Sequence, residues 1–254
     1  MRMGILSLIR ILAIVTAFLL PPKVLIAQEQ EAASVVLVHG AFADGSSWRH
    51  VVPVIQDAGL NVTAVQLPLE SLQGDAAIVR RAIDAIDGPV VLVGHSWGGM
   101  VITEVGDHEK VRSLVYLSAV APMHGQSFLD VAHEAPDAQG MSELVIDSSG
   151  YVTMSPKGFT KYFAQDLPSS ESSVLATMQG ALNTKALQDE VTQVAWENRP
   201  NFYAITVDDY IVPVELQRML ASRIGASVIE IPASHASMLS MPDQIAAFIL
   251  AAAR

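Results

Sequence analysis

Cysteine is absent from the 254 residues of this chain, which excludes disulfides, a cysteine nucleophile and thiolate metal sites. Charged residues are also scarce, at 16%, where roughly a quarter is usual. Hydrophobic residues make up 51%, so the chain can bury a large core and global disorder is excluded. Acidic residues outnumber basic ones by 26 to 15, which gives a net charge of −11. This balance argues against a general nucleic-acid surface, and we expect no nucleic-acid partner.

The first 27 residues have the pattern of a secretory signal peptide. Arg2 and Arg10 give a basic start, residues 11–20 are almost wholly apolar, and Ala27 offers a small residue for cleavage. The apolar run is short for a membrane span, which needs about 20 residues. We therefore expect a secreted or periplasmic mature chain without stable membrane insertion. The alternative is an uncleaved N-terminal membrane anchor.

From residue 28 onward, apolar runs that suit strands alternate with segments of helical spacing. Such alternation predicts one α/β domain over residues 28–254, a doubly wound, mostly parallel sheet with helices on both faces. The predicted strands are 35–38, 61–66, 89–93, 111–118, 202–207 and 227–231. The predicted helices are 48–58, 76–86, the stretch after residue 99 to about 108, 214–224 and 246–253.

Residues 121–200 interrupt this alternation and are rich in Met, Ser, Asp and Gln. Helical patches occur near residues 157–165, 173–180 and 186–196. We interpret the segment as a helical cap inserted over the carboxyl edge of the sheet. Its methionines and aromatic residues are candidates to line an apolar substrate pocket.

Residues 94–98 read G-H-S-W-G and match the motif G-x-S-x-G. The motif follows an apolar strand and precedes a helix, which is the context of a nucleophile elbow. The flanking glycines allow a sharp turn that holds the Ser96 hydroxyl clear of the sheet, at the positive end of a helix. Ser96 is therefore the candidate nucleophile.

A serine nucleophile needs a base and an acid that orients the base. His235 stands in a loop after the last predicted strand, where such sheets place their sites. The other six histidines fall in turn motifs, on outer helices or in the insertion: His39, His50, His95, His108, His124 and His133. Asp208 and Asp209 both follow the strand that ends at Val207, and strand-end geometry does not separate these two candidate acids.

Residues 39–42, H-G-A-F, follow the first predicted strand and face the same edge as Ser96. The backbone N–H groups of Ala41 and Trp97 are the candidate oxyanion-hole donors, each worth roughly 3–4 kcal/mol in such sites. No G-x-G-x-x-G or P-loop lysine occurs in a suitable context, and no histidine pair at i, i+4 has a third ligand. We expect neither a cofactor nor a metal.

These motifs resemble those of α/β-hydrolases over residues 34–253. More narrowly, the chain is similar to the compact group that contains plant methylesterases, hydroxynitrile lyases and bacterial carboxylesterases. The resemblance is carried by residues 36–41 (V-L-V-H-G-A), 94–99 (G-H-S-W-G-G), 209–213 (D-Y-I-V-P) and 234–239 (S-H-A-S-M-L). The acid of this family usually stands in D-x-x-[IV]-P, which selects Asp209 over Asp208.

The resemblance implies a serine hydrolase that cleaves a carboxylic ester of a small, largely apolar molecule through an acyl-enzyme. Phe42, Met123 and Met238 are the candidate substrate-binding residues. Lyases of this group carry a lysine directly after the catalytic histidine, where this chain has Ala236, so the resemblance disfavours lyase activity. The alternatives are a receptor-like ligand-binding protein of the same fold, or a cofactor-free perhydrolase or lyase.

Overall fold

The computed structural model describes residues 33–254. The predicted signal peptide of residues 1–27 lies outside this part of the chain. Within it, no helix is both long enough and apolar enough to cross a membrane.

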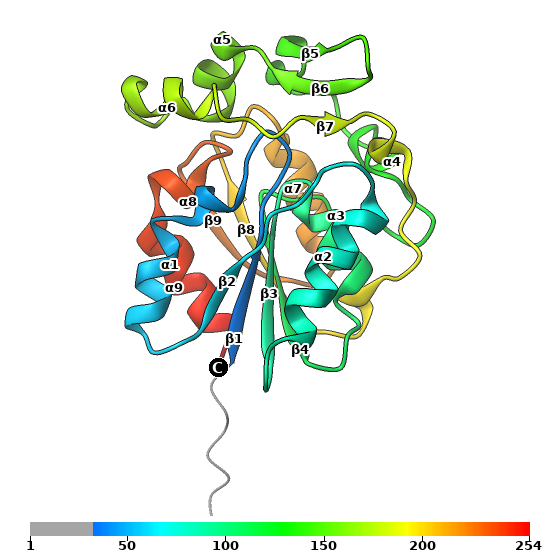
Figure 1. Cartoon of the computed structure of the whole chain (residues 1–254), viewed down its shortest axis with the longest axis vertical. Helices are drawn as coiled ribbons and strands as arrows, with labels where there is room; N and C mark the ends of the chain where they lie inside the picture. The colour runs from blue at the N-terminus through cyan, green and yellow to red at the C-terminus, as the bar shows by residue number, and fades with distance from the viewer. Residues whose placement is uncertain (1–32) are drawn as a thin grey trace, which may run out of the picture. The chain divides into compact units, whose positions relative to one another are not determined.

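A parallel six-stranded sheet forms the centre of the described chain, in the order β2-β1-β3-β4-β8-β9 (Figure 1). The predicted α/β class is confirmed. Every residue of the central strands β1 and β3 is buried, which explains their continuous apolar runs, because helices cover both faces. The strands are β1 (Ser34–Val38), β2 (Val62–Ala64), β3 (Val90–His95), β4 (Val111–Leu117), β8 (Asn201–Thr206) and β9 (Ser227–Ile231).

The main helices lie on the two faces of this sheet. α1 (Val51–Asp57) packs with α9 (Pro242–Ala252) on one face, and α2 (Leu72–Asp84) packs with α3 (Gly98–Val105) on the other (Figure 1). α7 (Val214–Arg223) packs on β8, and the short α8 (Ser237–Ser240) precedes α9.

Helix α2 begins four residues before its predicted start at residue 76. The Ser71 side chain accepts a hydrogen bond from the Gly74 N–H at this end. This N-cap satisfies an otherwise unpaired donor of the first turn and lets the helix begin at Leu72.

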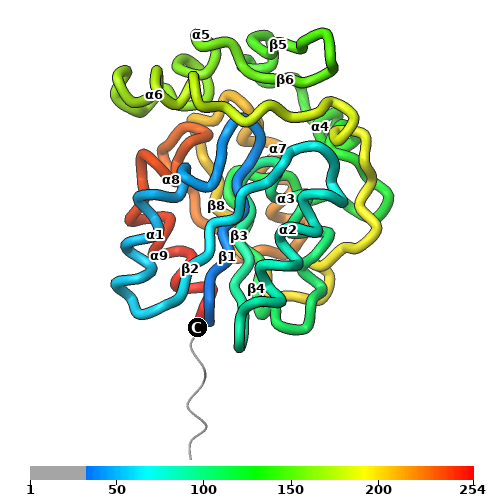
Figure 2. The backbone as a smooth tube through the Cα atoms, viewed as in Figure 1, coloured from blue at the N-terminus to red at the C-terminus, as the bar shows by residue number. Residues whose placement is uncertain are grey.

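The chain between β4 and β8 forms the cap, which lies across the carboxyl ends of the strands (Figures 1 and 2). We expected a helical insertion, and that prediction was incomplete. Three short strands form an antiparallel sheet in the order β5-β6-β7. The cap elements are α4 (Phe128–Ala132), β5 (Leu144–Ile146), β6 (Tyr151–Met154), α5 (Pro156–Gly158), a π-helical turn (Phe159–Phe163), α6 (Ser169–Leu175) and β7 (Leu182–Asn183).

The β5–β6 hairpin escaped prediction because local turn contacts, not a long periodic pattern, define it. The Asp147 carboxylate accepts hydrogen bonds from the backbone N–H groups of Ser149 and Tyr151. Gly150 takes a φ of +87°, which a residue with a Cβ rarely adopts. The strands on either side have only three and four residues, too few to show a reliable alternation.

Candidate active site

The turn from β3 into α3 is sharp and closely packed. Ser96 has a φ of +54°, a left-handed conformation that is strained for a residue with a side chain. A Cβ added at Gly94 would lie 2.6 Å from the Gly98 carbonyl oxygen, and one at Gly98 would lie 2.7 Å from the Val38 oxygen. Both glycines are therefore required by space, as the elbow motif predicts.

The turn after β1 packs directly on this elbow. A Cβ at Gly40 would lie 2.6 Å from the Ser96 Cβ, so only glycine lets the two turns approach this closely. The contact brings Ala41 and Phe42 beside Ser96 and Trp97, and all four line one cavity of about 110 Å³. The two residues predicted to supply oxyanion donors thus flank the candidate nucleophile.

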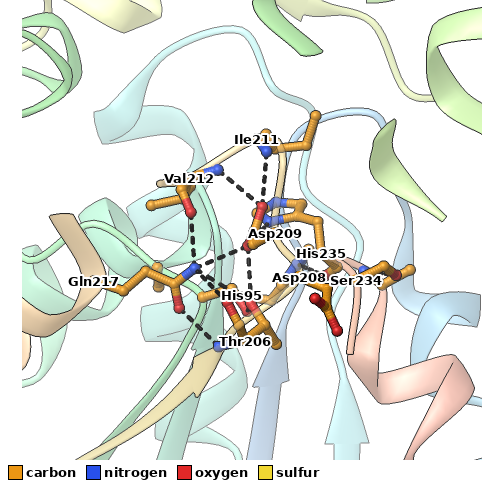
Figure 3. Close-up of polar contacts among 12 residues, drawn as sticks. His95, Thr206, Asp208, Asp209, Ile211, Val212, Gln217, Ser234 and His235 are labelled. Atoms are coloured by element: carbon orange, nitrogen blue, oxygen red, sulfur yellow. Dashed lines mark hydrogen bonds and ion pairs between the residues drawn. The ribbon is translucent and has the colours of Figure 1, made fainter. Parts of the chain in front are cut away.

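His235 forms a buried pair with Asp209. Its Nδ1 lies 2.7 Å from the Asp209 Oδ2, and both side chains are 0% exposed (Figure 3). Asp208 is exposed and has no part in this pair. The His235 Nε2 is buried and has no hydrogen-bond partner among the described residues. An imidazole that donates Nδ1–H to a carboxylate keeps its Nε2 lone pair available to accept a proton.

The Asp209 carboxylate accepts four further hydrogen bonds. Oδ1 accepts from the backbone N–H groups of Ile211 and Val212, at 2.8 and 2.9 Å. Oδ2 accepts from the Thr206 hydroxyl at 2.9 Å and from the Gln217 amide at 3.0 Å. These donors fix the direction of the carboxylate toward His235 (Figure 3).

The sequence did not single out Thr206 or Gln217. Gln217 is fully buried on the inward face of α7, beside Leu216 and Leu220. Its amide also accepts from the Thr206 backbone N–H and donates to the Val212 carbonyl. A polar residue on an otherwise apolar inward helix face was the only signal that could have revealed it.

Two turn histidines, His95 and His39, form hydrogen bonds that hold the loops of the site together. The His95 Nε2–H donates to the His235 carbonyl at 2.9 Å, and the two ring centroids lie 4.6 Å apart. Burial, with the neighbouring His235, holds the pKa of His95 well below its ordinary value. His39 donates Nδ1–H to the Gly40 carbonyl and accepts at Nε2 from the Leu67 N–H. Burial lowers the pKa of His39 as well.

Residues 35–248 match the family model described as "Alpha/beta hydrolase family". The chain belongs to the α/β-hydrolase family. This match, together with the relatives described next, confirms the predicted resemblance to its esterase group.

Named relatives of this hydrolase come from bacteria and plants. It is 25% identical over 245 residues to a pyrethroid hydrolase of Sphingobium wenxiniae, which covers 84% of each chain. It is 28% identical over 240 residues to an α-hydroxynitrile lyase of Arabidopsis thaliana, covering 83% of this chain and 93% of the lyase. The crystal structure of polyneuridine aldehyde esterase matches with a TM-score of 0.76 and 25% identity, over 87% of this chain and 99% of that one.

The three predicted substrate-binding residues of the hydrolase lie in different surroundings. Phe42 lines the Ser96 cavity. Met238 lines a neighbouring space of about 20 Å³ together with Phe42 and Phe163. Met123 is 43% exposed and does not line the Ser96 cavity, so its position does not support the predicted role. The cap supplies most of the remaining wall of the Ser96 cavity, from Phe128 to Leu187, and Ile211 completes it.

A buried acid beneath the elbow of the hydrolase was also missed. Asp75 accepts hydrogen bonds from the Trp97 indole N–H at 2.7 Å and from the Leu69 backbone N–H at 2.9 Å. Burial raises the pKa of Asp75 to about 6. The residue lies on α2, far from the motifs in sequence, and nothing in its local pattern marks it.

Proposed function

We propose that this hydrolase is a serine esterase that cleaves neutral, largely apolar carboxylic esters through an acyl-enzyme. The buried His235–Asp209 pair, with its unpaired His235 Nε2, carries the proposal. The His235 ring packs on His95, the residue before the strained Ser96. Ser96 is the nucleophile, His235 the general base and Asp209 the acid that orients it. No Ser96–His235 hydrogen bond is present in the described chain, and such catalytic bonds often tighten only when substrate binds.

In the first half-reaction, the Ser96 Oγ forms a bond to the ester carbonyl carbon while His235 Nε2 takes the hydroxyl proton. The N–H groups of Ala41 and Trp97 stabilise the negative charge that develops on the carbonyl oxygen. His235 then gives the proton to the alcohol oxygen as its bond to carbon breaks. In the second half, water attacks the acyl-Ser96 ester with His235 again as base. The carboxylic acid is released, and His235 returns a proton to the Ser96 Oγ, which restores the free hydroxyl.

Two further observations support ester chemistry. The relatives include proteins named as an esterase and a pyrethroid hydrolase. The Ser96 cavity is lined mainly by apolar side chains, such as Phe42, Ile146 and Leu182, which suits an uncharged substrate.

Active-site titration with p-nitrophenyl acetate tests the proposal. We expect a burst of one p-nitrophenolate per chain and a serine-linked acetyl group in the intact mass. Ser96→Ala should abolish both and lower turnover by about 10⁴-fold or more. Ser149→Ala, on the exposed β5–β6 turn, is the matched control and should behave as wild type. A Ser96→Ala variant that keeps a tenth of the wild-type rate would contradict the esterase assignment. A wild type that binds p-nitrophenyl acetate without hydrolysing it would also contradict it.

We also propose that residues 1–27 export the chain and are then removed. Their basic start and apolar run support this. Expression of the full chain in a bacterial host, followed by mass determination of the periplasmic protein, tests it. A full-length mass in the membrane fraction would support the anchored alternative instead.

A further inference from the structure

A second cavity, lined mainly by apolar side chains but also by His133 and Asp137, adjoins the cavity that contains Ser96. It measures about 220 Å³ and lies between α4, the segment of residues 136–144 and the start of α7. The two cavities share five wall residues, all apolar: Phe128, Met141, Leu144, Leu187 and Ile211. A single layer of side chains therefore separates them.

The Ser96 cavity is small for an ester pocket when taken alone. Its volume of about 110 Å³ is well below the range of roughly 300–1,000 Å³ that is typical of ligand sites. The second cavity adds about 220 Å³, twice the volume of the first, and this brings the joint space into that range. A substrate that fills both spaces must carry a long or bulky apolar group.

The acyl group, not the alcohol, points toward the second cavity. The alcohol oxygen must receive its proton from His235, so the alcohol lies on the His235 side. Phe163 and Ala236, which flank His235, line the small space of about 20 Å³ that reaches the exposed Met178. Neither residue lines the two larger cavities, which leaves those to the acyl side.

Met141 is the movable part of the wall between the two cavities. The backbone beside it is fixed, because the Gly140 N–H donates to the Tyr210 carbonyl at 2.9 Å. A Cβ at Gly140 would lie 2.5 Å from the Ile211 Cδ1, so this segment sits tightly against the loop that carries Asp209. The unbranched methionine side chain changes rotamer readily and can withdraw while its backbone stays in place.

We propose that the second cavity is the far compartment of the acyl pocket, which receives the end of a long apolar acyl chain past Met141. The proposal rests on the serine-esterase function above and narrows its substrates to esters of medium-chain or bulky apolar carboxylic acids. Each methylene buried there is worth about fourfold in kcat/KM, from roughly 0.8 kcal/mol per methylene.

The p-nitrophenyl esters of acetate, butanoate and octanoate test this chain-length preference. For the wild type we expect kcat/KM to be at least about tenfold higher for octanoate than for acetate. Ala132 lines only the second cavity of the two, so Ala132→Trp should fill it and lower the octanoate-to-acetate ratio by about tenfold. Met141→Ala removes part of the wall and should raise the ratio. Ala247→Trp, at an exposed position of α9, is the matched control and should leave the ratio unchanged.

The opposite signs of the two variants separate a substrate compartment from a general disturbance of the fold. Equal loss of acetate and octanoate turnover in Ala132→Trp overturns the proposal, as does a fall in the ratio for Met141→Ala. If circular dichroism shows that Ala132→Trp does not fold, the Met141→Ala ratio decides alone. A wild type with a normal acetate burst but no gain with chain length refutes the far compartment and leaves the esterase intact. The absence of any burst refutes the esterase itself.

Discussion

At the scale of single residues, hydrogen bonds hold the carboxylate of Asp209 on both of its oxygens. Five donors surround its two oxygens, and one of them is the His235 ring. Its neighbour Asp208 is exposed, and its backbone carbonyl accepts a hydrogen bond from Gln165. Two identical side chains, adjacent in sequence, thus have different surroundings and different expected importance.

We predict that Asp209→Asn lowers kcat/KM for p-nitrophenyl acetate by about 10⁴-fold, because an amide no longer holds the His235 tautomer that leaves Nε2 free. Asp208→Asn is the matched control and should stay within about twofold of wild type, because its side chain faces solvent. Steady-state kinetics on both folded variants checks this. The reverse ranking would show that Asp208 is the acid.

The buried carboxyl group of Asp75 makes the stability of the fold depend on pH. Its pKa is raised to about 6 in the folded chain by burial, while an unfolded aspartate titrates near about 3.9. The stability that this group contributes is fully present below its unfolded pKa and is lost as pH rises through about 6. Raising the pH from 4.5 to 7.5 should therefore cost the wild type about 2 kcal/mol through this group.

The measurement is urea unfolding of wild type and Asp75→Asn at several pH values across this range. Asparagine does not titrate, so the stability of the variant relative to wild type should rise with pH by about the same 2 kcal/mol. A constant difference between the two proteins at all pH values would mean that burial does not raise the Asp75 pKa.

At the scale of elements, the site depends on the contact between two turns, the one after β1 and the elbow after β3. Gly40 and Gly98 make this contact sterically feasible, since a Cβ at either would overlap the other turn. The same contact places Ala41 beside Ser96. The fold positions the site by aligning strand ends, and the glycines let those ends meet.

We predict that Gly40→Ala lowers kcat at least about tenfold and destabilises the fold by roughly 1–3 kcal/mol, because the new methyl group displaces Ser96. Gly59→Ala is the control. Unlike Gly40, Gly59 has a positive φ, +85°, and a Cβ there meets nothing within 4 Å. It should cost roughly 1–3 kcal/mol from backbone strain and leave kcat unchanged. Thermal unfolding and kinetics together check both, and unchanged kcat in folded Gly40→Ala would argue against the role of this turn contact.

At the scale of the whole molecule, the chain carries a net charge of −11. A field of one sign repels substrates of the same sign over about 10 Å at 0.1 M salt and farther at low salt. The apolar wall of the Ser96 cavity offers no lysine or arginine to offset this repulsion.

We therefore predict that kcat/KM for an ester that bears a free carboxylate is lower than for its neutral analogue. The anionic ester should gain at least about twofold when salt rises from 10 to 300 mM, while the neutral ester should change little. Paired rate measurements at several salt concentrations test this. Faster turnover of the anionic ester at low salt would indicate a cationic group near the cavity.

The sequence by itself determined the features that local patterns encode. The runs of residues 35–38 and 89–93 predicted the buried strands β1 and β3, because a strand covered on both faces is apolar throughout. The glycines around Ser96 predicted the elbow, because a sharp turn has few solutions. The place of His235 after the last predicted strand made it the candidate base.

Only the tertiary structure decided which distant residues meet. It brought His235 against Asp209, the aspartate that the family pattern had selected. It also joined Asp75 to Trp97 and placed Met123 away from the Ser96 cavity. It also turned part of the expected helical cap into an antiparallel sheet. These outcomes depend on packing between segments that are far apart in the chain, and periodicity reports only which face of one segment is buried, not what covers it.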